Sequence, residues 1–152
     1  NFFMQKAIEL SINNIQKKGG PFGCVIVKDN KIISEGVNGV TLNNDPTAHA
    51  EIVAIRNACK KLNTFVLSGC ELYSSCEPCP MCLSAIYWSH IERVYYGNSR
   101  QDAAKIEFDD KLIYDELNKS IHDRKIPLKQ ILKYEAIKAF DLWTKTENKT
   151  KY

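Results

Sequence analysis

Four residues in two short segments have the types and the spacing that metal-assisted hydrolysis requires. One residue separates His49 from Glu51, and two residues separate Cys79 from Cys82. A catalytic zinc ion usually has three protein ligands, drawn from imidazole and thiolate groups, and keeps a fourth position open for water. His49, Cys79 and Cys82 supply that number of ligands. The sequence therefore predicts a zinc site with one open position.

Glu51 is the candidate proton carrier beside this site. Two residues after His49 on a helix, its carboxylate lies near the metal without being required as a ligand. Zinc lowers the pKa of a bound water towards about 7, and a neighbouring carboxylate can accept that proton and return it to a substrate. Hydrolysis of an amidine-like C–NH2 bond needs this sequence of events.

Other roles for the cysteine pair remain open from the residues alone. Structural zinc sites and thioredoxin-like redox pairs also use two cysteines with this spacing. A structural site would normally show a fourth ligand, for which Cys76, three residues before Cys79, is the most credible candidate. His90 and His122 stand singly, which is typical of surface or packing residues. We rank catalytic zinc first, structural zinc second and a redox pair third.

The elements that must position these residues alternate between helices and strands. Helices are expected over residues 2–18, from the Asp45-Pro46 start through Leu62, from Pro78 or Pro80 to about His90, and over 108–118 and 136–145; strands are expected over 23–28, 31–35, 71–75, 93–96 and 128–134, with a hairpin turn at Asp29-Asn30. Each ligand segment then lies at a strand-to-helix junction, where the helix dipole favours thiolate. The pattern predicts a three-layer α/β arrangement around a mixed sheet.

Bulk composition is that of an ordinary globular protein. The 152 residues suit a single domain, 44% are hydrophobic and 26% are charged, and the net charge is only +3. The basic residues are scattered, which argues against nucleic acid, and no apolar run or leader suggests a membrane, so the cytoplasm is the default location. Cys24, Cys59 and Cys70 suit small buried hydrophobes. The polar tail from Thr146 to Tyr152 is expected to be mobile unless something holds it.

The motif His49-Ala50-Glu51, followed by Pro78-Cys79-Pro80-Met81-Cys82, resembles the signature of the cytidine deaminase superfamily. Further stretches at 20–23, 43–48 and 75–78 resemble the branch that contains guanine, cytosine and tRNA adenosine deaminases. Residues 85–88, 108–114, 124–127 and 151–152 favour the bacterial guanine deaminases within that branch. The resemblance spans nearly the whole chain and implies a three-layer α/β/α cytidine-deaminase-like fold with a central five-stranded mixed sheet.

Carried over position by position, the resemblance also implies the functional residues and the assembly. They are His49, Cys79 and Cys82 for one zinc ion, Glu51 as proton shuttle, Asp110 as a second acidic residue for substrate contact and proton transfer, and Phe22, Asn38, Ala50, Trp88 and Tyr152 for the purine. It implies an intertwined homodimer in which the C-terminal segment, from about residue 135 to 152, crosses to the partner and closes its active site.

The leading functional prediction is hydrolysis of guanine to xanthine and ammonia. Deamination of tRNA adenosine or of cytosine is the main alternative. A polynucleotide substrate calls for cations around the pocket, whereas the acidic residues Asp109, Asp110, Asp115 and Glu116 would repel phosphate at its entrance. A binding or scaffold protein that kept the zinc fold but lost catalysis is a third alternative, against which the presence of Glu51 argues.

Overall fold

The computed structural model describes residues 1–152, which form two compact units, Asn1–Asp110 and Lys111–Tyr152. The first unit contains α1 (Phe2–Gln16), β1 (Gly23–Lys28), β2 (Lys31–Val37), α2 (Val40–Asn43), α3 (Ala50–Leu62), β3 (Cys70–Cys76), α4 (Pro80–Trp88), β4 (Arg93–Asn98) and α5 (Arg100–Lys105). The second contains α6 (Lys111–Leu117) and α7 (Lys133–Lys145). None of these helices has both the length and the apolar character needed to cross a membrane.

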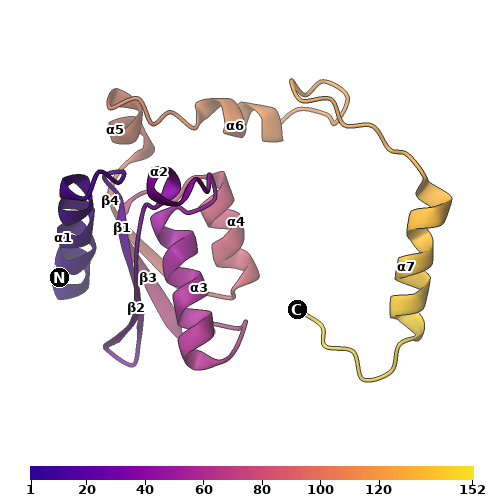
Figure 1. Ribbon diagram of the computed structural model, residues 1–152, viewed down its shortest axis with the longest axis horizontal. Coiled ribbons are helices and arrows are strands. Elements are labelled where there is room, and N and C mark those ends of the chain that lie inside the picture. The colour runs from indigo at the N-terminus through magenta and orange to yellow at the C-terminus, as the bar shows by residue number, and fades with distance from the viewer. The chain divides into compact units, whose positions relative to one another are not determined.

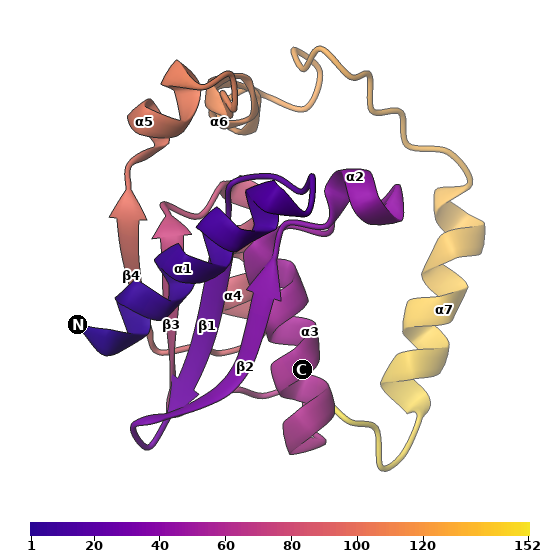
Figure 2. The same ribbon diagram turned by 60° about the vertical axis from the view of Figure 1, so that its left-hand side comes forward.

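The sheet of the first unit has the order β2-β1-β3-β4 (Figure 2). β1 pairs antiparallel with both β2 and β3, whereas β3 and β4 run parallel, so the sheet is mixed as predicted. The predicted hairpin is confirmed: β1 and β2 are joined through Asp29 and Asn30, whose φ angles are 49° and 59°. Two positive φ angles in a two-residue turn match the right-handed twist of the flanking strands.

Helices cover both faces of this sheet, with α1 on one side and α3 and α4 on the other (Figures 1 and 2). Successive side chains of a strand point to opposite faces, and β1 is buried on both. Cys24 and Ile26 join the core beneath α3 and α4, while Val25 and Val27 join the core beneath α1. The predicted three-layer arrangement is confirmed, and it fixes which face of each strand meets the helix that carries His49 and Glu51.

Gly36 allows α3 to lie directly on β2. A Cβ atom at this position would lie 2.1 Å from the carbonyl oxygen of Ala50 and 2.5 Å from the backbone nitrogen of Ala54. Neither backbone atom can move without displacing the helix. The absence of a side chain at Gly36 therefore sets the distance between the sheet and the first turns of α3.

Two expectations from the sequence were wrong. The sheet has four strands and not five, because residues 128–132 adopt no regular structure and α7 begins at Lys133. A strand needs a neighbour for its backbone groups, and the apolar run alone does not provide one. α3 begins at Ala50 rather than near Asp45, because Asp45 Oδ1 accepts hydrogen bonds from the backbone nitrogen and the hydroxyl of Thr47 at 2.8 and 2.7 Å. Asp45 thus closes a local turn instead of capping the helix.

The second unit consists of α6, α7 and the segments around them. Within α6 and the loop after it, Glu116 accepts hydrogen bonds from Lys119 Nζ at 2.6 Å and from the backbone nitrogen of Lys125 at 2.5 Å. After α7, Lys149 Nζ donates to the carbonyls of Trp143 and Thr144 at 2.8 and 2.7 Å. The positive charge of Lys149 thereby satisfies carbonyl groups at the negative end of the helix dipole, which holds the first part of the tail.

Candidate active site

Both predicted ligand segments lie at the N-terminal ends of helices. His49 is the N-cap residue of α3, Cys79 is the N-cap residue of α4, and Cys82 lies in the first turn of α4. Neither N-cap side chain makes a capping hydrogen bond, so the imidazole and the thiol are available as ligands. Pro80, at the first position of α4, lacks the N–H group that would have no partner there. The predicted strand-to-helix junction is confirmed for Cys79, which follows β3, whereas the short helix α2 lies between β2 and His49.

The three ligand side chains converge on one point. Their ligand atoms all lie within 4.8 Å of one another. His49 Nδ1 lies 3.6 Å from Cys79 Sγ and 3.5 Å from Cys82 Sγ. Zinc at about 2.3 Å from sulfur and about 2.05 Å from nitrogen places tetrahedral S and N ligands about 3.6 Å apart. These side chains therefore fit a tetrahedral zinc ion with no rearrangement.

Electrostatics at the helix entries favours metal binding. Hydrogen bonds from the Cys82 thiol and from His49 lower the pKa of Cys79 to about 4, against the opposing effect of burial. The pKa of Cys82 is raised, first by its hydrogen bond to Cys79 and then by burial, so the two thiols share one proton. The hydrogen bond to Cys79 raises the pKa of His49. A divalent cation would replace the protons that these groups hold between them.

Glu51 lies beside the three ligands, in the first turn of α3, and is only 6% exposed. Its Oε2 atom lies 3.5 Å from Cys82 Sγ, and its Oε1 atom accepts a hydrogen bond of 3.2 Å from Ser74 Oγ. Burial is the main cause that raises the pKa of Glu51. One oxygen of the carboxylate is thus held by the sheet, while the other faces the ligand cluster, as an acid–base group beside a metal requires.

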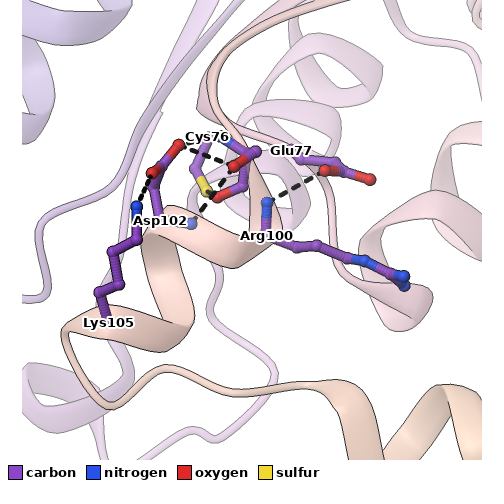
Figure 3. A network of polar contacts seen from close by, with 6 residues as sticks. Cys76, Glu77, Arg100, Asp102 and Lys105 are labelled. Carbon is purple, nitrogen blue, oxygen red and sulfur yellow. Dashed lines mark hydrogen bonds and ion pairs between the residues drawn. The ribbon is translucent and has the colours of Figure 1, made fainter.

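Cys76, the rival ligand, makes its hydrogen bond outside the cluster. Its thiol donates to the carbonyl of Ser99 at 3.7 Å, next to the bond from the backbone nitrogen of Arg100 to Glu77 Oε2 at 3.0 Å (Figure 3). Burial and the charge of Glu51 raise the pKa of Cys76 to about 11, so the thiol stays protonated. Cys76 is not part of the group that could hold a metal ion. The structure offers three protein ligands, the number typical of a catalytic site.

Three of the predicted substrate residues, Ala50, Phe22 and Asn38, lie in the first unit. Ala50, fully buried, separates His49 from Glu51 at the start of α3. The ring of Phe22 packs edge-on against Phe108, with 5.0 Å between ring centroids. Asn38 is 6% exposed, and its backbone nitrogen donates to the carbonyl of Phe22 at 3.1 Å. The segments that carry Phe22 and Asn38 are therefore joined to each other.

The remaining predicted residues lie further along the chain. Asp110 ends the first unit, and its pKa is raised by burial and by the negative charge of Cys79, which places it within electrostatic reach of the ligands. Trp88 lies at the C-terminal end of α4, about 9 Å along the helix axis from Cys82. Tyr152 belongs to the second unit. The contacts of Trp88 and Tyr152 with a substrate stay predictions.

Sequence reasoning missed two contacts, that of Ser74 with Glu51 and that of Phe108 with Phe22. Ser74 shares with Leu72 the face of β3 that meets α3, and it is 1% exposed. A polar residue where the alternation calls for an apolar one was the available signal. Phe108 has no such signal, because it follows the short helix α5 and reaches Phe22 only through the tertiary fold.

The fold and the site together indicate the class of protein to which the chain belongs. Residues 1–98 match the family model described as the cytidine and deoxycytidylate deaminase zinc-binding region. This match covers more than half of the chain and includes His49, Glu51, Cys79 and Cys82. The chain belongs to this family of zinc-dependent deaminases.

Particular relatives are similar over different lengths. The chain is 49% identical to the guanine deaminase of Bacillus subtilis over 99% of its own length and 97% of that protein, and the crystal structure of that enzyme superposes with a TM-score of 0.96. It is 45% identical to the tRNA-specific adenosine deaminase of Aquifex aeolicus over 63% of its length and 64% of that protein. A guanine deaminase structure from Nitrosomonas europaea matches 71% of the chain and 63% of that protein at 34% identity, with a TM-score of 0.68.

Proposed function

We propose that this protein hydrolyses guanine to xanthine and ammonia. The observation that carries the proposal is the extent of the similarity to the Bacillus subtilis guanine deaminase, which runs through the second unit, Lys111–Tyr152. The match with the Aquifex aeolicus tRNA-specific adenosine deaminase covers only 96 residues. Since the ligand cluster is shared by both kinds of enzyme, the rest of the chain is what separates a guanine substrate from a tRNA.

His49, Cys79 and Cys82 would hold the zinc ion. Zinc supplies a Lewis acid that lowers the pKa of a coordinated water towards about 7. Ser74 holds one oxygen of Glu51, and the other oxygen lies beside Cys82, on the side of the ligand cluster. The negative charges of the cysteine thiolates and of Glu51 suit a divalent cation in this partly buried place.

Glu51 would move the protons of the reaction. It takes one proton from the attacking water and passes it to the ring nitrogen next to the carbon that bears the amine, while the new C–O bond forms at that carbon. It then carries the second proton from the new hydroxyl to the amine, the C–N bond breaks, and ammonia leaves. Burial raises the pKa of Glu51, which brings this carboxyl closer to the range in which it can both accept and return a proton.

The purine would be held by aromatic rings and one amide. Phe22, placed edge-on against Phe108, offers a face for stacking, and Asn38 can donate to and accept from a base edge. Asp110 is the candidate second acid, because burial and then the negative charge of Cys79 raise its pKa. Trp88 and Tyr152 complete the pocket in this proposal.

An ammonia-release assay with guanine, cytosine, adenine and a tRNA anticodon stem-loop tests the substrate directly. Turnover of guanine well above that of the other three is the expected result. Preference for the stem-loop would assign the chain to tRNA deamination instead. Zinc binding with no turnover of any of the four would support the scaffold alternative.

We further propose that two copies of the chain assemble and exchange C-terminal segments. The chain exposes large apolar residues on separate elements, among them Tyr87 on α4 at 76% and Phe140 on α7 at 70%, and β4 is an edge strand. Large apolar side chains that gather in an exposed patch usually mark a protein interface. β4 has an open edge, where a segment of a second copy would find partners for its backbone groups.

Complementation between two inactive chains tests the exchange. One chain lacks Tyr152, and the other carries Glu51→Gln with an intact tail. If the tail closes the partner's site, a mixed dimer holds one complete site, and co-expression restores up to half of the activity per dimer. Co-expression without recovery, in dimers confirmed by light scattering, would contradict exchange of the tail.

A further inference from the structure

Asn14 is a buried polar residue on the helix that lies across the sheet from the ligand cluster. It shares the inner face of α1 with Ala7 and Ser11 and is 2% exposed. The mechanism proposed above gives it no role. An amide side chain on the buried face of the last turn of α1 requires an explanation, because a buried polar group is costly unless it is fully hydrogen-bonded.

Its side chain makes two hydrogen bonds from one atom. Asn14 Nδ2 donates to the carbonyl oxygen of Gly20 and to the carbonyl oxygen of Asn38, both at 2.8 Å. A primary amide carries two N–H donors on one nitrogen, which neither a hydroxyl nor a carboxylate can match. The amide is also closely packed, because a Cβ atom on Gly19 would lie 2.3 Å from Asn14 Nδ2. Both the chemistry and the packing thus call for asparagine.

The two acceptor carbonyls belong to the segments that carry the candidate base contacts. The carbonyl of Gly20 also accepts from the backbone nitrogen of Phe22 at 2.8 Å, and the carbonyl of Phe22 accepts from the backbone nitrogen of Asn38 at 3.1 Å. Asn14, Gly20, Phe22 and Asn38 therefore form a closed ring of hydrogen bonds. This ring fixes where the backbones of Phe22 and Asn38 lie relative to each other.

In the side-chain amide of Asn38, the oxygen is hydrogen-bonded within the chain and the nitrogen is available to a ligand. Its Oδ1 accepts from the backbone nitrogen of Val40 at 3.3 Å, and its Nδ2 has no partner within the chain. With the oxygen held in this way, the amide nitrogen is the end that can donate to an acceptor on a ligand, such as a ring nitrogen or an exocyclic oxygen of a purine. The placement of Asn38 by Asn14 therefore determines where that donor lies.

We propose that Asn14 is a positioning residue for purine binding, which acts from the far side of the sheet through the backbones of Gly20 and Asn38. The inference rests on the proposed function. His49, Glu51, Cys79 and Cys82 lie at the N-terminal ends of α3 and α4, and none of them bonds to Asn14. Asn14 consequently sets the affinity for the base and leaves the rate of the chemical step nearly unchanged.

The test compares Asn14→Asp with Asn13→Asp in the full-length zinc protein. Both substitutions exchange a neutral amide for a negatively charged carboxylate of nearly the same shape, but Asn13 is exposed at the neighbouring position of the same helix. In Asn14→Asp an acceptor faces two carbonyl oxygens. We expect KM for guanine and the calorimetric Kd for xanthine to rise at least tenfold in Asn14→Asp, with kcat within threefold and zinc content unchanged. Asn13→Asp should match the wild type within twofold.

A second variant approaches the same contact without altering Asn14. A Cβ atom on Gly20 would lie 2.9 Å from Asn38 Cγ, so Gly20→Ala pushes the Asn38 side chain from its place. The same rise in KM and Kd is expected. This variant decides the matter if Asn14→Asp does not fold, since an unchanged KM and Kd in Gly20→Ala would overturn the inference.

Two further outcomes separate this inference from the proposed function. Unchanged KM and Kd in a folded Asn14→Asp protein, or a loss confined to kcat, overturns the role of Asn14 while the proposed function stands. A wild-type protein that neither binds xanthine nor deaminates guanine overturns the proposed function, and this inference with it.

Discussion

Ser74 and Glu51 form a buried pair, with the hydroxyl of Ser74 3.2 Å from Oε1 of the carboxylate. Ser74 comes from the middle of the sheet and Glu51 from the first turn of α3, so the pair joins the two layers at the ligand cluster. This hydrogen bond engages one carboxylate oxygen and thereby also fixes the direction in which the other oxygen points. A freely rotating carboxylate would spend only part of its time in reach of the reacting atoms.

Removal of this hydrogen bond should slow turnover without loss of the metal. We predict that Ser74→Ala lowers kcat about tenfold, equivalent to about 1.4 kcal/mol, with one zinc per chain retained. Ser74→Thr keeps the hydroxyl and should restore most of the rate. Ser75→Ala is the matched control, because Ser75 Oγ instead accepts from the backbone nitrogen of Gly23 at 3.0 Å. Steady-state kinetics in which Ser74→Ala equals the wild type would show that the pair has no part in catalysis.

Cys76 and Cys79 should differ in their importance for zinc. Because the Cys76 thiol donates to Ser99 and stays protonated, Cys76→Ala should keep one zinc per chain by elemental analysis. Cys79→Ala removes one of three ligands and should lower zinc affinity at least a hundredfold. Loss of zinc from Cys76→Ala would indicate a four-ligand structural site and would contradict the open position.

Alkylation should reveal the lowered pKa of Cys79 once zinc is removed by a chelator. The thiolate is the reactive form, and at a pKa of about 4 it is almost fully formed above pH 5. The rate of carboxymethylation at Cys79, followed by peptide mass spectrometry, should therefore be flat from pH 6 to 8. An ordinary thiol would react roughly a hundred times faster at pH 8 than at pH 6, and such a rise at Cys79 would refute the assigned pKa. Added zinc should protect both Cys79 and Cys82.

Gly36→Ala should destabilise the fold and the site together. The new methyl group would meet the backbone of Ala50 and Ala54, so α3 must move away from the sheet. We predict a loss of about 2 kcal/mol in the free energy of unfolding, measured by urea denaturation of the zinc-loaded protein. Gly69→Ala serves for comparison, since a Cβ there has no contact closer than 3.6 Å, although its φ of 78° carries a smaller strain. Equal stability of Gly36→Ala and the wild type would mean that α3 and β2 are not held at this distance.

The sequence was sufficient to predict the ligands because their chemistry is local. The spacings His49 to Glu51 and Cys79 to Cys82 place each pair within one helical turn, and the proline at position 80 marks the start of α4. The hairpin at Asp29 and Asn30 is equally local. Such features depend on neighbours in the chain, which are visible in the sequence itself.

Other features depend on contacts between distant segments. The apolar residues Ile8, Ile12 and Ile15 predict a helix correctly, yet all three are exposed, and α1 packs on the sheet through Ala7, Ser11 and Asn14. Small residues permit the close approach of helix and sheet, and Asn14 finds its acceptors on loops far along the chain. The spacing of apolar residues in the sequence does not reveal that α1 packs through this face. The prediction of a strand over residues 128–134 was wrong for the same reason. A strand needs a neighbouring strand, and the residues of the segment itself do not say which one that would be.

The most direct test of the central claim is the zinc content and guanine turnover of Glu51→Gln, which preserves the shape of the buried side chain but cannot take up a proton. We predict one zinc per chain, an unchanged fold and a loss of kcat of at least a thousandfold, since acid–base catalysis alone contributes roughly 10²–10⁴-fold. Turnover of guanine within tenfold of the wild type, by a protein that still holds its zinc, would contradict the assignment of Glu51 as the group that moves the protons.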